Sequence, residues 1–300
     1  MNAETADTAH KESMIRSDGF LEKSKRTNSV RLQLKEELEL PLEAEVLTPD
    51  VIGSLSRDEI LKLPVILGTR RYQVSDFFEI EGEKSRCLEL HGNLAMVKTI
   101  GRNMTGGSIV IHGNAGMHLG ASMSGGLITV HGNASDWLGA EMSGGLIRIR
   151  GNAGGRVGAA YSGSLSGMRG GVILIDGTAG IEVAKRMRRG LICVQGAVGD
   201  FAGLQMRGGT LFLCGTAGIR AGAWMSRGTI IALAPLQLLP TFIYACTHES
   251  DFLHLLLRQL HNSGVADLGY GWNYQVKRYT GDTSRLGKGE ILVCAPAGVQ

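Results

Sequence analysis

Short alternating runs of apolar and polar residues recur along the middle of the chain. Residues 127–131 read LITVH, and similar runs occupy residues 109–111, 146–150, 172–176, 191–195 and 210–214. Alternation with a period of two is typical of β-strands, and glycine-bearing bends separate one run from the next. Because each glycine costs a helix about 1 kcal/mol relative to alanine, the pattern disfavours helices here. We therefore predict short strands joined by sharp glycine corners.

These strands belong to a repeat of 19 residues. Every unit carries one methionine shortly before its glycines. These residues are Met104, Met123, Met142, Met168, Met187, Met206 and Met225. The steps are 19 residues long except for one of 26, which places a seven-residue insertion near residues 162–168. A unit of this size cannot bury its own apolar side, whereas stacked units bury it jointly. We predict a mainly β chain that forms a single-stranded parallel β-helix of about seven turns, with short α/β flanks.

Stacking places equivalent residues in ladders about 4.8 Å apart. We expect the methionine ladder to lie inside, where the flexible thioether fills gaps between small neighbours. A second ladder consists of Asn93, Asn114, Asn133 and Asn152. We expect it at a corner, with the side-chain amides hydrogen-bonded along the stack.

The repeat divides the chain into four segments. We predict a disordered extension over residues 1–28, an α/β segment over 29–86, the β-helix over 87–234, and a capping helix with an extended tail over 235–300. A strand is expected within 31–39, and a helix starts near Ser56 with Glu59 in the capping-box position. A second helix, from Ser250 to about His261, is expected to cover the open end of the solenoid. We place Phe252, Leu255, Leu256 and Leu260 on its apolar side.

Composition and charge exclude several classes. The 300 residues include 44 glycines but only 6 prolines, and 43% are hydrophobic, which excludes collagen and a wholly disordered chain. A net charge of +3 is too small to indicate a nucleic-acid-binding protein. The five cysteines form no CxxC pair, there is no secretory signal and no apolar run long enough to span a membrane. We expect a cytoplasmic protein without membrane or nucleic-acid partners.

Three histidines occupy the same position in successive turns, at His91, His112 and His131. A stacked trio has the ligand type that zinc prefers. However, the strand alternation points these side chains outward, and no carboxylate follows the same period, so we interpret them as outward-facing strand ends and expect no metal site. The chain also lacks a nucleophile elbow, and we expect no catalytic residue.

An arginine ladder is the most distinctive charge pattern. Arg169, Arg188 and Arg207 each follow a ladder methionine, whereas the first turns carry Thr105, Ser124 and Ser143 at that place. Arg189 and Arg227 stand one position later in their turns, and Lys185 and Arg186 stand just ahead of Met187. One interpretation is a solvated face on which like charges splay apart. The other is an anion-binding stripe in the second half of the rod.

The middle outward position of each strand changes character along the rod. It is occupied in order by Glu89, Val110, Thr129, Arg148, Leu174, Cys193, Phe212 and Ile231. The apolar second half is too long to leave exposed. Either the helix at 250–261 or a partner protein covers it, and we favour the helix because it is local.

Several blocks resemble a known family. They are PLEAEVLTPD (41–50), DFFEIEG (76–82), the GNAGxxxGAxMSGG units, LLPTF (238–242) and RYTGDTSRLGKGEILV (278–293). Together they resemble the C subunits of formylmethanofuran dehydrogenases and, more strongly, the C subunit of bacterial formyltransferase/hydrolase complexes, over residues 32–293. The repeat alone also resembles the C-terminal domain of the glutamate synthase large subunit. The resemblance implies a right-handed coil.

The resemblance also implies a function. It is a scaffold role in a one-carbon complex that converts formyl-tetrahydromethanopterin through formylmethanofuran to formate. The chemistry and the metal then belong to partners: an amidohydrolase-like A subunit, a B subunit, and a formyltransferase D subunit. No cofactor is expected in this chain, and methanofuran is the carrier. Its glutamate-rich tail, or an acidic partner surface, is a suitable ligand for Arg169, Arg188 and Arg207. A molybdenum or tungsten dehydrogenase and a glutamate-synthase-like module remain alternatives.

Overall fold

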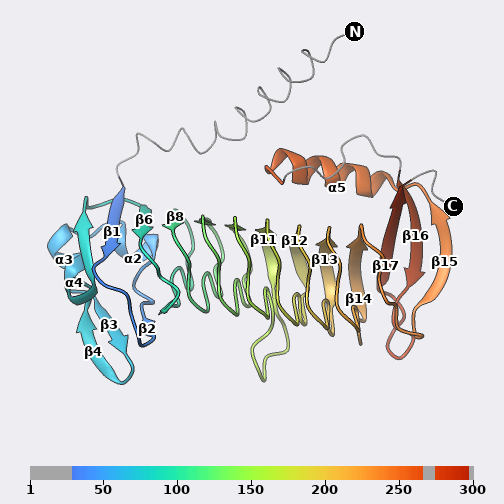
Figure 1. The fold of residues 1–300 in the computed structure, drawn as a ribbon, viewed down its shortest axis with the longest axis horizontal. Coiled ribbons are helices and arrows are strands. Elements are labelled where there is room, and N and C mark those ends of the chain that lie inside the picture. The colour runs from blue at the N-terminus through green and yellow to red at the C-terminus, as the bar shows by residue number, and fades with distance from the viewer. Residues whose placement is uncertain (1–28, 266–273, 297–300) are drawn as a thin grey trace, which may run out of the picture.

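The chain forms a long rod built mainly from β-strands, as shown by a computed structural model that describes residues 29–265 and 274–296 (Figure 1). A 13-stranded sheet follows the rod from β15 (Ile243–His248), β16 (Tyr274–Thr280) and β17 (Glu290–Pro296) at one end, through the repeat strands β14 to β8 and β6, to β1 (Val30–Leu34) and β5 (Phe78–Glu81) at the other. Every pair from β1–β6 to β14–β17 is parallel, and antiparallel pairs occur only at the two ends of this sheet. The predicted mainly β class is confirmed. Within the described residues, no helix is long and apolar enough to cross a membrane.

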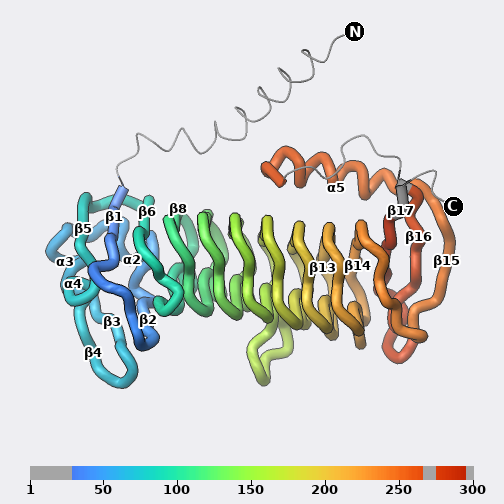
Figure 2. The backbone as a smooth tube through the Cα atoms, viewed as in Figure 1, coloured from blue at the N-terminus to red at the C-terminus, as the bar shows by residue number. Residues whose placement is uncertain are grey.

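The strands of the repeat lie where the alternating pattern predicts them. They are β6 (Cys87–His91), β8 (Ser108–His112), β9 (Leu127–Val130), β10 (Leu146–Ile149), β11 (Arg169–Ile175), β12 (Arg189–Val194), β13 (Arg207–Leu213) and β14 (Arg227–Ala232). A second row of parallel bridges runs from Leu94–Ala115 to Val198–Ala217. The seven-residue insertion forms a loop that projects from the rod opposite α5, while β10 and β11 remain paired across it (Figure 2).

The predicted methionine ladder is inside the rod, and all of its side chains are fully buried. Each methionine methyl lies against a glycine of the following turn. A Cβ added at Gly145, for example, would lie 2.6 Å from Cε of Met123. The asparagine ladder is confirmed as well, because Oδ1 of Asn114 accepts a 2.9 Å hydrogen bond from the backbone N–H of Asn133.

The N-terminal module adds the first strands of the large sheet. In it β1 (Val30–Leu34) lies between β6 and the antiparallel β5 (Phe78–Glu81). The observed strand, Val30–Leu34, is shorter than the alternating segment 31–39 in which a strand was predicted. The capping box is confirmed, since the Glu59 carboxylate accepts hydrogen bonds from the Ser56 N–H at 2.8 Å and the Ser56 hydroxyl at 2.7 Å. The predicted extension over 1–28 lies outside the described residues.

The rest of this module is a small sheet with three short helices. The sheet has the order β4 (Arg70–Gln73), β3 (Pro64–Leu67), β2 (Leu42–Glu43) and β7 (Val97–Lys98). The helices are α2 (Pro49–Ile52), α3 (Arg57–Leu61) and α4 (Val74–Phe77).

Strands, rather than the predicted helix, cover the C-terminal end of the coil. Here β17 (Glu290–Pro296) pairs in parallel with β14, and β16 (Tyr274–Thr280) and β15 (Ile243–His248) follow in antiparallel order. Ile291 and Leu292 of β17 stand beside Ile230 and Ile231. They therefore continue the inner and outer apolar rows by one more strand.

Helix α5 (Asp251–Asn262) lies along the side of the rod instead of at its end (Figure 1). As predicted, Ser250 caps it, with the hydroxyl accepting from the Leu253 N–H at 3.3 Å. The buried face consists of Leu253, Leu256, Leu257 and Leu260, which pack on the outward row of Leu174, Cys193, Phe212 and Ile231. The favoured cover for that row is confirmed. The predicted face was partly wrong, because Phe252 and Leu255 are exposed.

Candidate functional site

Five arginines line one hollow in the second half of the rod. The hollow has a volume of about 750 Å³, and its lining is Arg169, Arg188, Arg189, Arg207, Gly208, Ser226 and Arg227. None of these lining residues is acidic. The three arginines singled out from the sequence therefore lie together, and Arg189 and Arg227 join them.

The methionine ladder fixes where these arginines leave the rod. The backbone N–H of Arg169 donates to the carbonyl of Met142 at 2.7 Å, and that of Arg188 donates to the carbonyl of Met168 at 2.8 Å. These bonds hold the arginine backbone against the preceding turn, one residue beyond a fully buried methionine. The arginine side chains accordingly project outward and are exposed.

The strand register differs from the straight ladder that a 19-residue period predicts. Arg169 pairs with Arg189, and Arg207 pairs with Arg227. In both pairs the register shifts before the next partners, Val172 with Leu191 and Thr210 with Thr229. The extra residue in β11 and β13 is a β-bulge. It brings arginines from two repeat positions into one surface.

The five arginines of the hollow have no ion-pair partner in the part of the chain that the structure describes. Lys185 and Arg186, which are close to them in sequence, are engaged elsewhere. Lys185 pairs with Glu182 at 2.7 Å, and Arg186 donates to the carbonyl of Ser164 at 2.6 Å. A surface of unpaired guanidinium groups is suited to a ligand that carries several carboxylates or phosphates.

At the start of the rod, the position after the ladder methionine lies against an acidic side chain instead of carrying an arginine. Thr105 follows the first ladder methionine, and Asp50 accepts hydrogen bonds from its backbone N–H and its hydroxyl, both at 2.7 Å. Partial burial raises the pKa of Asp50, but these hydrogen bonds and the Arg86 guanidinium outweigh it and hold the pKa below the ordinary value. The carboxylate is therefore charged and already partnered, so the first turn carries a negative group at the level where the later turns carry arginines.

The three histidines form a stack, as the outward alternation predicts. Ring centroids of His91 and His112 are 4.3 Å apart, and those of His112 and His131 are 5.1 Å apart, with nearly parallel planes. Partial burial lowers the pKa of His112 and His131, and the neighbouring histidines lower that of His112 further. Glu89 lies beside this stack, with Oε2 3.8 Å from Nε2 of His91.

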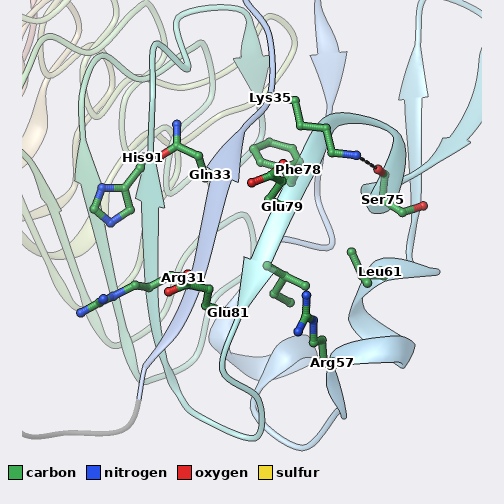
Figure 3. Close-up of a pocket in the computed structure, with 11 residues that line it drawn as sticks. Arg31, Gln33, Lys35, Arg57, Leu61, Ser75, Phe78, Glu79, Glu81 and His91 are labelled. Carbon is green, nitrogen blue, oxygen red and sulfur yellow. Dashed lines mark hydrogen bonds between the residues drawn. The ribbon is translucent and has the colours of Figure 1, made fainter.

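A second hollow, which the sequence did not indicate, lies in the N-terminal module (Figure 3). Its volume is about 730 Å³, and its lining includes the charged residues Arg31, Lys35, Arg57, Glu79 and Glu81 together with His91. Both signs of charge are present, and Lys35 is already bound to the carbonyl of Ser75 at 2.7 Å. The pairing of β1 with both β5 and β6, together with the position of α3, brings these residues together, which explains why no local pattern revealed them.

Buried thiols in this chain are poor nucleophiles. The hydrogen bond with Cys214, together with burial, raises the pKa of Cys193 far above the ordinary thiol value. Burial raises the pKa of Cys294 to about 12. Because the thiolate is the reactive form, neither group is activated for covalent chemistry.

Comparison with known proteins gives close likenesses. A chain in the crystal structure of the formyltransferase/hydrolase complex from Methylorubrum extorquens, solved with methylofuran, superimposes with a TM-score of 0.80. It is 34% identical, and the match covers 88% of this chain and 99% of that one. The C subunit of the molybdenum-containing formylmethanofuran dehydrogenase 1 from Methanosarcina barkeri is 38% identical over 90 residues, 28% of this chain and 30% of the relative.

The C subunit of the tungsten-containing dehydrogenase 2 from Methanothermobacter wolfeii is 39% identical over 98 residues, 31% of this chain and 36% of the relative. The matched segments thus span about a third of the length of these dehydrogenase subunits. No protein-family model matches the chain. The near-complete match to the crystallised chain nevertheless exceeds what a shared repeat produces, because it includes both flanking modules. The chain belongs to the family of formylmethanofuran dehydrogenase C subunits, which includes the corresponding chain of the formyltransferase/hydrolase complex.

Proposed function

We propose that this chain is the non-catalytic C subunit of a formyltransferase/hydrolase complex. The complex transfers the formyl group of formyl-tetrahydromethanopterin to methanofuran and hydrolyses formylmethanofuran to formate. Its proposed partners are an amidohydrolase-like A subunit, a B subunit, and a formyltransferase D subunit. In this proposal the partners supply the metal and the catalytic groups, and this chain holds them in place.

The observation that carries this proposal is the extent of the structural likeness. The superposition covers 88% of this chain and 99% of a chain from a formyltransferase/hydrolase complex, at 34% identity. The C subunit of a molybdenum or tungsten dehydrogenase is the second candidate, because the dehydrogenase subunits are 38–39% identical over the matched segments.

The architecture supports a scaffold role. We propose that the stacked turns form a right-handed parallel β-helix. The row of parallel strands and the second row of bridges between the same turns support the parallel β-helix. Its right-handed sense is what the resemblance to the family implies. An interior of methionine and aliphatic side chains leaves little room for a substrate. A rigid rod of this kind offers long surfaces to neighbouring subunits.

We further propose that the arginine hollow binds the glutamate-rich tail of methanofuran. Five guanidinium groups that have no ion-pair partner among the described residues match a chain of carboxylates on one surface. Because these side chains are exposed, solvent screening limits each contact to about 0.2–1 kcal/mol. An anchored tail would keep the reactive amine near two active sites while it moves between them. An acidic surface on a partner protein is the competing ligand.

Purification of the native complex through a tag on this chain tests the proposed assembly. Mass spectrometry should identify an amidohydrolase and a formyltransferase. A molybdopterin-bearing partner would instead establish the dehydrogenase, and a synthase with flavin and iron–sulfur centres would establish the amidotransferase module. Recovery of the chain alone from a native extract would contradict the scaffold role.

Charge reversal tests the hollow. Arg169→Glu, Arg188→Glu and Arg207→Glu combined should raise the apparent KM for methanofuran more than tenfold, since each reversal replaces an attraction of up to about 1 kcal/mol with a repulsion. The matched control reverses Arg70, Arg71 and Lys84, which are exposed in the N-terminal module. Dissociation of the complex with unchanged KM would favour the acidic partner. Unchanged KM and intact assembly would refute both ligands.

A further inference from the structure

Glu89, His91 and His112 form a compact cluster in the first turns of the rod. Glu89 and His91 are two residues apart on β6 and point to the same side, and His112 pairs directly with His91 from β8. One ligand atom from each of the three lies within 4.8 Å of the others. From the sequence, zinc was considered only at the three stacked histidines and no metal site was expected, whereas the compact set contains Glu89 in place of His131.

One nitrogen in this cluster lacks a partner. Nε2 of His91 is buried and has no hydrogen bond to any atom that the structure describes. The nearest acidic oxygen, Oε2 of Glu89, is 3.8 Å away, which is too long for a hydrogen bond. A buried polar atom without a partner is costly, and a bound cation would remove that cost.

We propose that Glu89, His91 and His112 bind a divalent transition-metal ion, Zn²⁺, and leave its fourth position open. Two imidazole nitrogens and one carboxylate oxygen are a ligand set that zinc uses in proteins. Ligand atoms of a tetrahedral zinc site are about 3.4 Å apart, given metal–ligand distances of about 2.1 Å. The rings of His91 and His112 now stack at 13° to one another, so one of them has to rotate out of the stack before both nitrogens can point at one ion. The three side chains are not fully buried, which leaves room for that rotation.

Arg31 competes with the ion for Glu89. Its Nε donates to Oε2 of Glu89 at 3.0 Å, and its side chain is 55% exposed, so it is free to move into solvent when the ion binds. His131 is the third ring of the stack but does not belong to the ligand set. Substitutions of Arg31 and His131 therefore distinguish a specific zinc site from general metal affinity of a histidine-rich surface.

Titration calorimetry of the full chain with ZnCl₂, after treatment with a chelator, tests the proposal. We expect one saturable site. His91→Ala, His112→Ala and Glu89→Gln should each weaken binding at least tenfold, and His131→Ala should change it less than twofold. Arg31→Ala should strengthen binding severalfold, because it removes the competing cation. Thermal unfolding of each variant verifies that the rod is intact.

Cobalt substitution gives a second readout that does not depend on affinity. Co²⁺ bound at this site should show the intense visible absorption of four-coordinate cobalt, and excess Zn²⁺ should abolish it. Absence of saturable binding, or equal losses for His131→Ala and His112→Ala, would overturn the proposal. Because the isolated chain is used, neither result depends on which complex the chain joins.

Discussion

Replacing Gly145 with alanine tests whether the methionine ladder and its facing glycines pack as a single unit. The backbone φ of Gly145 is +87°, and an added Cβ would lie 2.6 Å from Cε of Met123 and 2.8 Å from the carbonyl oxygen of Gly126. Two costs therefore combine at one position, a left-handed backbone conformation and an overfilled interior.

Each cost has a known size. A non-glycine residue in the left-handed region loses about 1–2 kcal/mol, and overpacking of a well-filled core costs typically about 1–3 kcal/mol. Gly145→Ala should therefore destabilise the chain by roughly 2–5 kcal/mol. Gly163 is the matched control, because its φ is +85° but nothing lies within 4 Å of an added Cβ. Gly163→Ala should cost only the backbone part.

Thermal unfolding followed by circular dichroism measures the difference. At about 2 °C per kcal/mol for a chain of this size, Gly145→Ala should lower Tm by roughly 4–10 °C and Gly163→Ala by roughly 2–4 °C. Adding Met123→Ala should make the double variant less destabilised than the sum of the two single variants. Equal Tm shifts for the two glycine variants would refute the packing argument.

Three other predictions concern the outer surface. Arg148 is buried, pairs with Asp176 at 3.0 Å, and donates to the carbonyls of Ser263 and Gly264, both at 2.6 Å. Arg148→Met breaks this buried ion pair, so it should lower the free energy of unfolding by about 3–5 kcal/mol and speed hydrogen exchange in α5, unlike Arg150→Met. Leu257→Ala should cost about 2–5 kcal/mol in urea unfolding, whereas Leu255→Ala, at an exposed position, should cost less than about 0.5 kcal/mol; similar costs would show that α5 is not packed on the rod. The fold lowers the pKa of His112 and His131. As the pH falls, the unfolded chain therefore binds protons at these two histidines before the folded chain does. Stability should thus be full above the ordinary histidine pKa of 6.5 and fall below it until the folded pKa is reached. The Tm of the native chain, measured with a chelator present, should therefore fall between about pH 7.5 and pH 5, and the double variant His112→Gln/His131→Gln should show a smaller fall. An equal fall in Tm for both proteins would contradict the role of these two histidines.

The repeat was predictable because its determinants are local. The spacing of Met104 to Met225 and the alternation within each strand fix which side chains point inward, whatever the distant parts of the chain do. The buried face of α5 was not predictable, because the helix sequence holds more apolar residues than one helix face can present. Only contact with the row from Leu174 to Ile231 selects Leu253 and Leu257 over Phe252 and Leu255.

Long-range pairing explains the other differences. Nothing near Leu292 indicates that it follows Ile231 in the outward row, since β15, α5 and β16 lie between β14 and β17 in the sequence. The arginine positions were evident from the sequence, but their two-row arrangement depends on bulges. A signal for it exists: Arg169 and Arg207 precede two glycines, whereas Arg189 and Arg227 precede one.

The unbroken pairing of β10 with β11 across the seven-residue insertion has a consequence for evolution and design. Because extra residues leave as a loop, the number of turns alone sets the length of the rod. Gain or loss of one 19-residue unit would move the two terminal modules apart or together by about 4.8 Å, with both modules unchanged. The distance between partners bound at the two ends of the rod would therefore change only in multiples of about 4.8 Å.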